Sequence, residues 1–96
     1  MLIGKIVGTV VATIKDEHLV GMRFHVVESV GVDGKPTGTS VIAVDAVGAG
    51  VGEIILYATG SSARQTVLTK DRPVDAVIMA IVDHLEVDGE LRYVKK

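Results

Sequence analysis

The stretch from Val44 to Gln65, VDAVGAGVGEIILYATGSSARQ, decides how the rest of the chain is interpreted. It joins a loop with glycines at 48, 50 and 52 to an apolar run and then to a short helix signal. Glycine has no Cβ, so its backbone can adopt positive φ and other atoms can approach it closely. The main functional question is therefore what approaches this loop: a phosphate, a substrate or a second copy of the protein.

The composition predicts a small, mainly β protein. A length of 96 residues corresponds to one domain, which we place at residues 1–96. Only three residues are aromatic, so the core must be built largely from the valines and isoleucines. These β-branched side chains fit pleated sheets better than helices. A domain of this size buries a modest share of its surface, which favours association with other copies.

Several classes of function are disfavoured by what the sequence lacks. There is no cysteine, so disulfides, thiolate zinc sites and thiol nucleophiles are excluded. The net charge is −2, the only basic run is Lys95-Lys96, and few aromatic side chains are present to stack on bases, so we expect no nucleic-acid partner. Met1–Lys15 has neither the pattern of a signal peptide nor that of a spanning helix. We therefore expect a cytoplasmic protein with no membrane partner.

The periodicity of apolar residues predicts six strands and one short helix. In the first strand the even-numbered residues are all apolar or glycine, and we expect them to face inward. Asp33-Gly34 and Asp88-Gly89 are hairpin signals. The segment 74–87 fits a helix or a strand, and we choose a strand because the second hairpin needs a pairing partner. The expected strands are Leu2–Ile14, Met22–Val30, Ser40–Asp45, Glu53–Thr59, Val74–Val87 and Glu90–Val94, with Lys95 and Lys96 frayed. Together they predict a closed or nearly closed barrel.

The glycine loop partly matches a dinucleotide-binding fingerprint. That motif requires a third glycine where Glu53 stands and a helix after it, but an apolar strand pattern follows instead. Gly60-Ser61-Ser62-Ala63 similarly lacks the second glycine of a nucleophile elbow, because Arg64 occupies that position. We interpret Ser61 or Ser62 as the cap of a short helix.

The titratable residues do not form a recognisable active site. His18, His25 and His84 lack the spacing of a helical metal pair, and we expect His25 and His84 to face solvent or a neighbour from a strand. Asp45 and Glu53 border the glycine loop. We expect Asp45 to accept backbone N–H bonds and Arg64 to be available as an ion partner. The sequence therefore predicts no enzyme activity, no metal and no cofactor.

Three motifs, taken together, resemble a known family. DAVGAGVGE (Asp45–Glu53), GSSARQ (Gly60–Gln65) and PVDAVIMAIVD (Pro73–Asp83) are similar in order and spacing to the vertex proteins of bacterial microcompartment shells, the EutN/CcmL family of ethanolamine-utilisation compartments and carboxysomes. GKIVGTVVATIK (Gly4–Lys15) followed by LVG (Leu19–Gly21) resembles the same family's first strand and loop. The resemblance covers nearly the whole chain.

The resemblance implies a five-stranded, OB-like barrel with one short α-helix and a C-terminal β-hairpin, assembled into a ring that is usually a pentamer. Such pentamers occupy the fivefold corners of a shell whose facets are hexameric proteins. We hypothesise that the subunit interface includes Asp45, Gly48, Ala49, Gly50, Gly52, Glu53, Ser61, Ser62, Arg64 and Gln65. The alternative function is an OB-like module that binds nucleic acid or a small nucleotide ligand.

Overall fold

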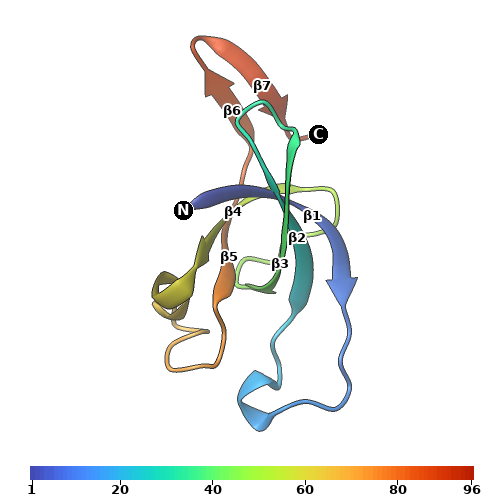
Figure 1. Cartoon of the computed structure of the whole chain (residues 1–96), viewed down its shortest axis with the longest axis vertical. Coiled ribbons are helices and arrows are strands. Elements are labelled where there is room, and N and C mark those ends of the chain that lie inside the picture. Colours follow the sequence, from blue (N-terminus) through green and yellow to red (C-terminus); the bar gives the residue numbers. More distant parts are fainter.

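The centre of the molecule is a closed barrel of five strands in the order β1-β2-β3-β5-β4. A computed structural model describes all residues, 1–96. Most neighbouring strands in the barrel pair antiparallel, but β3 and β5 pair in parallel over only two residue pairs. The barrel strands are β1 Leu2–Val10, β2 Phe24–Val30, β3 Pro36–Asp45, β4 Ile54–Thr59 and β5 Ala76–Ile81. The expected five-stranded barrel is confirmed (Figure 1).

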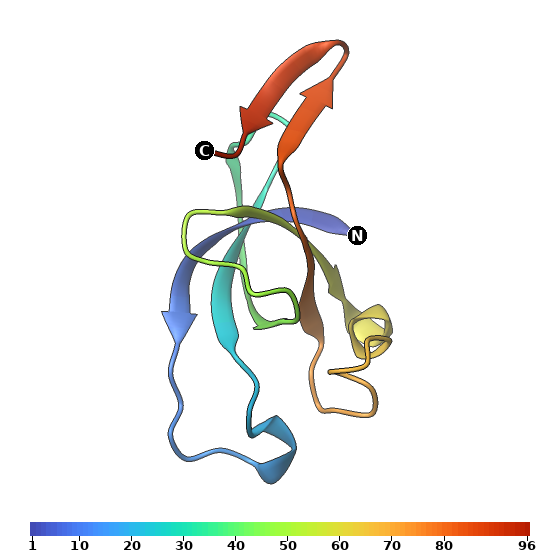
Figure 2. The ribbon, with the colours of Figure 1, turned by 180° about the vertical axis from the view of Figure 1, so that it is seen from behind.

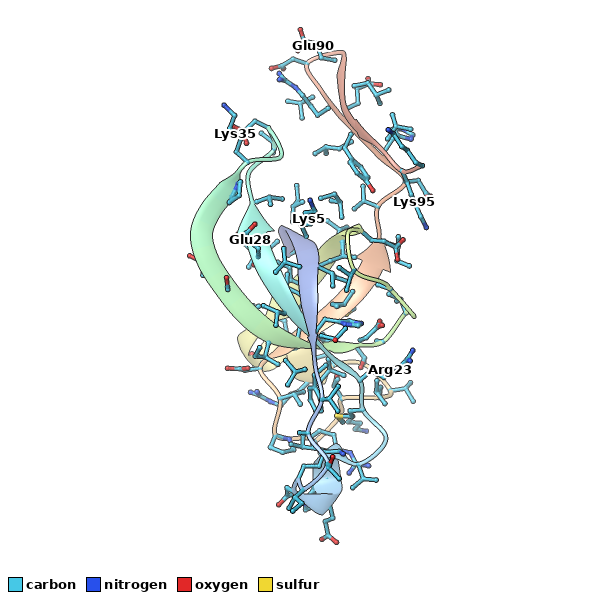
Figure 3. The ribbon with its side chains drawn as sticks, turned by 90° about the vertical axis from the view of Figure 1, so that its right-hand side faces the viewer. Lys5, Arg23, Glu28, Lys35, Glu90 and Lys95 are labelled. Atoms are coloured by element: carbon cyan, nitrogen blue, oxygen red, sulfur yellow. The ribbon has the colours of Figure 1, made fainter.

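A separate hairpin projects from one end of the barrel (Figure 1). It is formed by β6 His84–Val87 and β7 Glu90–Val94, which pair only with each other. Asp88 and Gly89 have φ angles of 53° and 78°, as the expected two-residue turn requires. The turn between β2 and β3 lies at the same end of the molecule, with Lys35 near its tip and Glu90 near the tip of the hairpin (Figure 3).

Three predicted strands differ from the structure by more than a shift of one or two residues at an end. The first strand ends at Val10 rather than Ile14, because its partner β2 begins only at Phe24, opposite Val10. The third strand begins at Pro36, which is acceptable because proline is tolerated as the first residue of a strand. The segment predicted as one strand at 74–87 is two strands, β5 and β6. Between them, Val82 still donates its backbone N–H to Ile54 of β4 before the chain leaves the barrel.

The expected short α-helix is a 3₁₀-helix, η2, at Gly60–Arg64. Five residues are too few for a stable α-helix, whereas a single 3₁₀ turn is common at this length. The residue before it is Thr59, and no side chain caps it, so the prediction that Ser61 or Ser62 caps this helix was wrong. A second 3₁₀ turn, η1, spans Glu17–Leu19. No helix in the structure is long and apolar enough to cross a membrane.

The core has two parts. Inside the barrel, Ile6, Val27, Ile55, Tyr57 and Ile78 pack together and are completely or almost completely buried. A second cluster lies around η2 and consists of Met22, Val44, Ala58, Ala63, Val74 and Val77. The inward orientation predicted for the even-numbered residues of the first strand is confirmed at Gly4 and Ile6, but Leu2, Ala12 and Ile14 are exposed. Gly8 and Val10 are only half-buried, and after a register shift between Ile6 and Gly8 they pair with the half-buried Val26 and Phe24.

Gly4→Ala is expected to lower the free energy of unfolding by about 1–3 kcal/mol, the usual range for overpacking a core. A Cβ at this position would lie 2.5 Å from Val27 Cγ1 and 2.9 Å from Tyr57 Cε1, so the barrel would have to shift. The matched control is Gly8→Ala, whose Cβ would lie 3.8 Å from the nearest atom, on Val26. Thermal unfolding of the two variants checks this. Equal melting temperatures would contradict the packing argument.

Candidate subunit interface

The start of the glycine loop is fixed by Asp45, the last residue of β3. Its Oδ1 atom accepts hydrogen bonds from the backbone N–H groups of Val47 and Gly48, both at 2.9 Å. The Asp45 side chain is 1% exposed, so these bonds are shielded from water. The prediction that Asp45 accepts backbone N–H bonds is confirmed. The loop therefore starts from a buried anchor.

His25 completes this anchor. Its Nε2 atom lies 3.1 Å from Asp45 Oδ2, and the ring is buried within the barrel. Of the two expectations for His25, solvent or a neighbour, the second is confirmed, because Ala43 of β3 lies opposite it and the buried carboxylate of Asp45 is two residues farther on. His84 is exposed to solvent. A carboxylate can only accept, so Nε2 carries the proton and donates it. The second ring nitrogen, Nδ1, is buried and has no partner.

The end of the loop is fixed by Glu53. Its Oε1 atom accepts a hydrogen bond from the Gly50 backbone N–H at 2.6 Å, and its Oε2 atom lies 2.9 Å from Lys95 Nζ. Lys95 also donates its backbone N–H to Asp83, so the prediction that it is frayed was wrong. Figure 3 shows Lys95 where the chain leaves β7. The C-terminal segment thus connects the hairpin to the glycine loop.

Both carboxyl groups have pKa values below their ordinary range. Burial acts to raise the pKa of Asp45, but the hydrogen bonds from the Val47, Ala49 and Gly48 amides and from His25 outweigh it and lower the pKa. The pKa of Glu53 is lowered first by its hydrogen bond from Lys95 and next by that from the Gly50 amide. Both groups are therefore ionised at neutral pH and accept these bonds as carboxylates.

These contacts determine what the loop can bind. A phosphate cradle requires free backbone N–H groups that point at the ligand. Here the amides of Val47, Gly48 and Gly50 already donate to carboxylates of the same chain. A phosphate would also meet two negative charges at this position. The geometry thus disfavours the nucleotide alternative and leaves the loop as a rigid protein surface.

Arg64 is not the ion partner that the sequence suggested. Its Nη1 atom donates to the backbone oxygen of Val74 at 3.0 Å, and neither Asp45 nor Glu53 pairs with it. This bond ties η2 to the segment that precedes β5. The structure also contains no group of three or more His, Asp or Glu side chains that could hold a metal ion.

The ten predicted interface residues form two patches. The loop patch consists of Asp45, Gly48, Ala49, Gly50, Gly52 and Glu53, and the helix patch consists of Ser61, Ser62, Arg64 and Gln65. Within the loop patch Asp45 and Ala49 are buried in the chain itself, so they support the surface and do not form it. The glycine loop lies beside the end of β1, whereas η2 lies on the opposite side of the barrel (Figures 1 and 2). His25 and Lys95 were not identified from the sequence as the partners of Asp45 and Glu53. Each lies next to apolar strand residues, and that position was the only signal for a carboxylate partner.

Comparison with known proteins places this geometry in a family. The model of the family described as "Ethanolamine utilisation protein EutN/carboxysome" matches residues 1–83. The carboxysome shell vertex protein CcmL of Gloeobacter violaceus is 41% identical over 96 residues, which cover 100% of this chain and 96% of CcmL. The shell vertex protein EutN of Salmonella typhimurium is 34% identical over 95 residues, covering 99% of this chain and 96% of EutN.

Solved structures agree with the sequence comparison. The structure of Gloeobacter violaceus CcmL superimposes with a TM-score of 0.93 at 40% identity, covering 99% of this chain and 98% of that one. The structure of GrpN, a pentameric microcompartment shell protein from Rhodospirillum rubrum, has a TM-score of 0.83 at 42% identity, covering 91% of this chain and 99% of GrpN. With a family model matching most of its length and relatives matching all of it, this chain belongs to the EutN/CcmL family.

Proposed function

We propose that this chain is a structural shell protein of a bacterial microcompartment, and that residues 1–96 form one vertex domain. Five copies would form a ring that occupies a fivefold vertex of the shell. The observation that carries this proposal is the similarity, over nearly the whole chain, to shell vertex proteins that include a pentameric one. The role is structural and requires no catalytic residue and no cofactor.

The placement of the two patches supports a ring. A cyclic assembly joins one surface of each subunit to a different surface of the next, and it closes when the rotation between them closes. The loop patch and the helix patch lie on different sides of the barrel, and a heterologous contact joins two different surfaces (Figure 2). The side chains of Asp45 and Glu53 hold the loop at both ends, and such preorganisation reduces the entropy lost when a neighbour binds.

The partners follow from the geometry of a closed shell. A flat layer of hexagons cannot close, and pentagons at the corners supply the missing curvature. We therefore expect this protein to contact its own copies and the hexameric shell proteins of the facets, in the shell of a compartment in the cytoplasm. Nucleic acid and membranes are not among the proposed partners.

Native mass spectrometry of the full-length wild-type chain tests the proposal. We expect the main species to contain five copies, because the ring is the building block of the vertex. Co-expression with hexameric shell proteins should then give closed particles only when this chain is present. A chain that stays monomeric at micromolar concentration would contradict the proposal. A band shift with single-stranded nucleic acid at moderate salt would instead support the binding-module alternative.

A further inference from the structure

The barrel seam between β1 and β4 opens into a groove. β1 pairs with β4 only over Leu2–Lys5. The last contacts on this side of β1 are two backbone hydrogen bonds that join Ile6 to Gly52 and Glu53. From Val7 to Val10 the strand has β2 on one side and no strand on the other. The resulting groove, which we call the seam groove, has a volume of about 570 Å³. It is lined by the end of β1 with the residues after it, the start of β2, and Ala49–Val51 of the glycine loop.

The seam groove has the character of a covered surface. Residues 6–14, IVGTVVATI, carry no charge. Proteins usually protect a free strand edge with charged side chains, because an uncharged edge invites association with another chain. Val11 is 89% exposed and Val51 is 61% exposed, and both line the groove. Two cationic side chains, Lys15 and Arg23, also line the groove, and Arg23 points away from the barrel (Figure 3). Apolar side chains of this size beside an uncharged edge indicate a site where another protein binds.

A complementary projection lies on the other side of the barrel, directly after η2. Val67 is fully exposed, and Leu68 beside it is 40% exposed. The turn that carries them is held by a buried threonine: Thr69 Oγ1 lies 2.6 Å from Thr66 Oγ1 and donates to the backbone oxygen of Ala63 at 2.5 Å. Lys70 also donates its backbone N–H to Thr66. The turn therefore presents Val67 rigidly to solvent, although nothing in the isolated chain uses that side chain.

We propose that the seam groove of each copy receives Val67 of the next copy in the ring. An apolar side chain on a preorganised turn is a typical anchor, because little entropy is lost when it becomes buried. The groove and the turn lie on opposite sides of one barrel, so each copy gives one contact and receives one, as a closed ring requires (Figure 2). The proposal rests on the proposed ring and specifies its contact.

Val67→Asp is the first test, read by native mass spectrometry and thermal unfolding. We expect the pentamer to be replaced by a folded monomer that still unfolds cooperatively. The barrel should remain intact because a fully exposed side chain contributes nothing to it. The matched control is Val32→Asp, a substitution of a 54% exposed valine in the turn between β2 and β3. The control should remain pentameric. A pentameric Val67→Asp variant would overturn the inference while leaving the proposed function intact.

Cross-linking gives a second test, since the natural chain has no cysteine. Oxidation of a variant with both Val67→Cys and Val11→Cys should give a ladder of covalent species ending at five copies. Each single variant should give no species larger than two copies. Pairing Val67→Cys with Val32→Cys is the control and should give no ladder. If that control forms the ladder and the Val11 pair does not, the seam groove is not the receiving surface. A monomeric wild-type chain would refute the proposed function itself.

Discussion

Asp45→Ala is expected to lower the free energy of unfolding by about 3 kcal/mol, within the range for losing hydrogen bonds to a buried charged group, and to abolish the ring. The substitution removes the acceptor for the Val47 and Gly48 amides and leaves His25 without its partner. The glycine loop then loses its inner anchor, and the surface it presents to a neighbour is no longer fixed. Chemical denaturation and native mass spectrometry measure the two effects.

Asp45→Asn is the matched control. The amide oxygen can still accept from the loop, and the side chain has almost the same size, so we expect a smaller loss of stability and partial assembly. The pH dependence gives an independent check. Because the folded-state pKa of Asp45 is lowered, its stabilising contribution is fully present above the unfolded value of about 3.9 and is lost as the pH falls through the folded-state value. The stability difference between wild type and Asp45→Ala should therefore shrink below about pH 4. A constant difference would contradict the assignment.

The barrel was predictable from the sequence because its signals are local. Alternation along β1 places Gly4 and Ile6 inside, and the Asp88-Gly89 turn determines the hairpin. The boundaries were less predictable, because they depend on where the partner strand begins. β1 ends at Val10 only because β2 starts opposite it, although the apolar pattern continues to Ile14.

The anchors of the glycine loop were only half predictable. A carboxylate at Asp45 beside a loop is a local signal, and its bonds to Val47 and Gly48 span two and three residues. Its partner His25 is twenty residues away, and the contact depends on the register of β2 on β3. Lys95 reaches Glu53 only because the hairpin turns the chain back. The residues around His25 and Lys95 in the sequence determine neither the strand register nor the direction of the hairpin, so these two contacts could not be predicted locally.

Gly50→Val separates folding from assembly more sharply than any other substitution in the loop. Gly50 does not have a positive φ, and an added Cβ would meet only Glu53 Oε1, at 3.5 Å. A Cβ at this position therefore makes only an ordinary van der Waals contact, and we expect the free energy of unfolding to change by no more than about 1 kcal/mol. Gly50 lines the seam groove, so a valine there would occupy space that a neighbour needs. We expect loss of the pentamer with an intact monomer.

The neighbouring glycines provide the control. Gly48 and Gly52 have φ angles of 77° and 93°, a region in which a valine is strained whatever space surrounds it. Gly52→Val should therefore lower the melting temperature of the monomer itself, whereas Gly50→Val should not. Native mass spectrometry and thermal unfolding of both variants distinguish the cases. A Gly50→Val protein that remains pentameric would show that the loop does not contact a neighbour, because the substitution changes the outer surface and leaves both loop anchors in place.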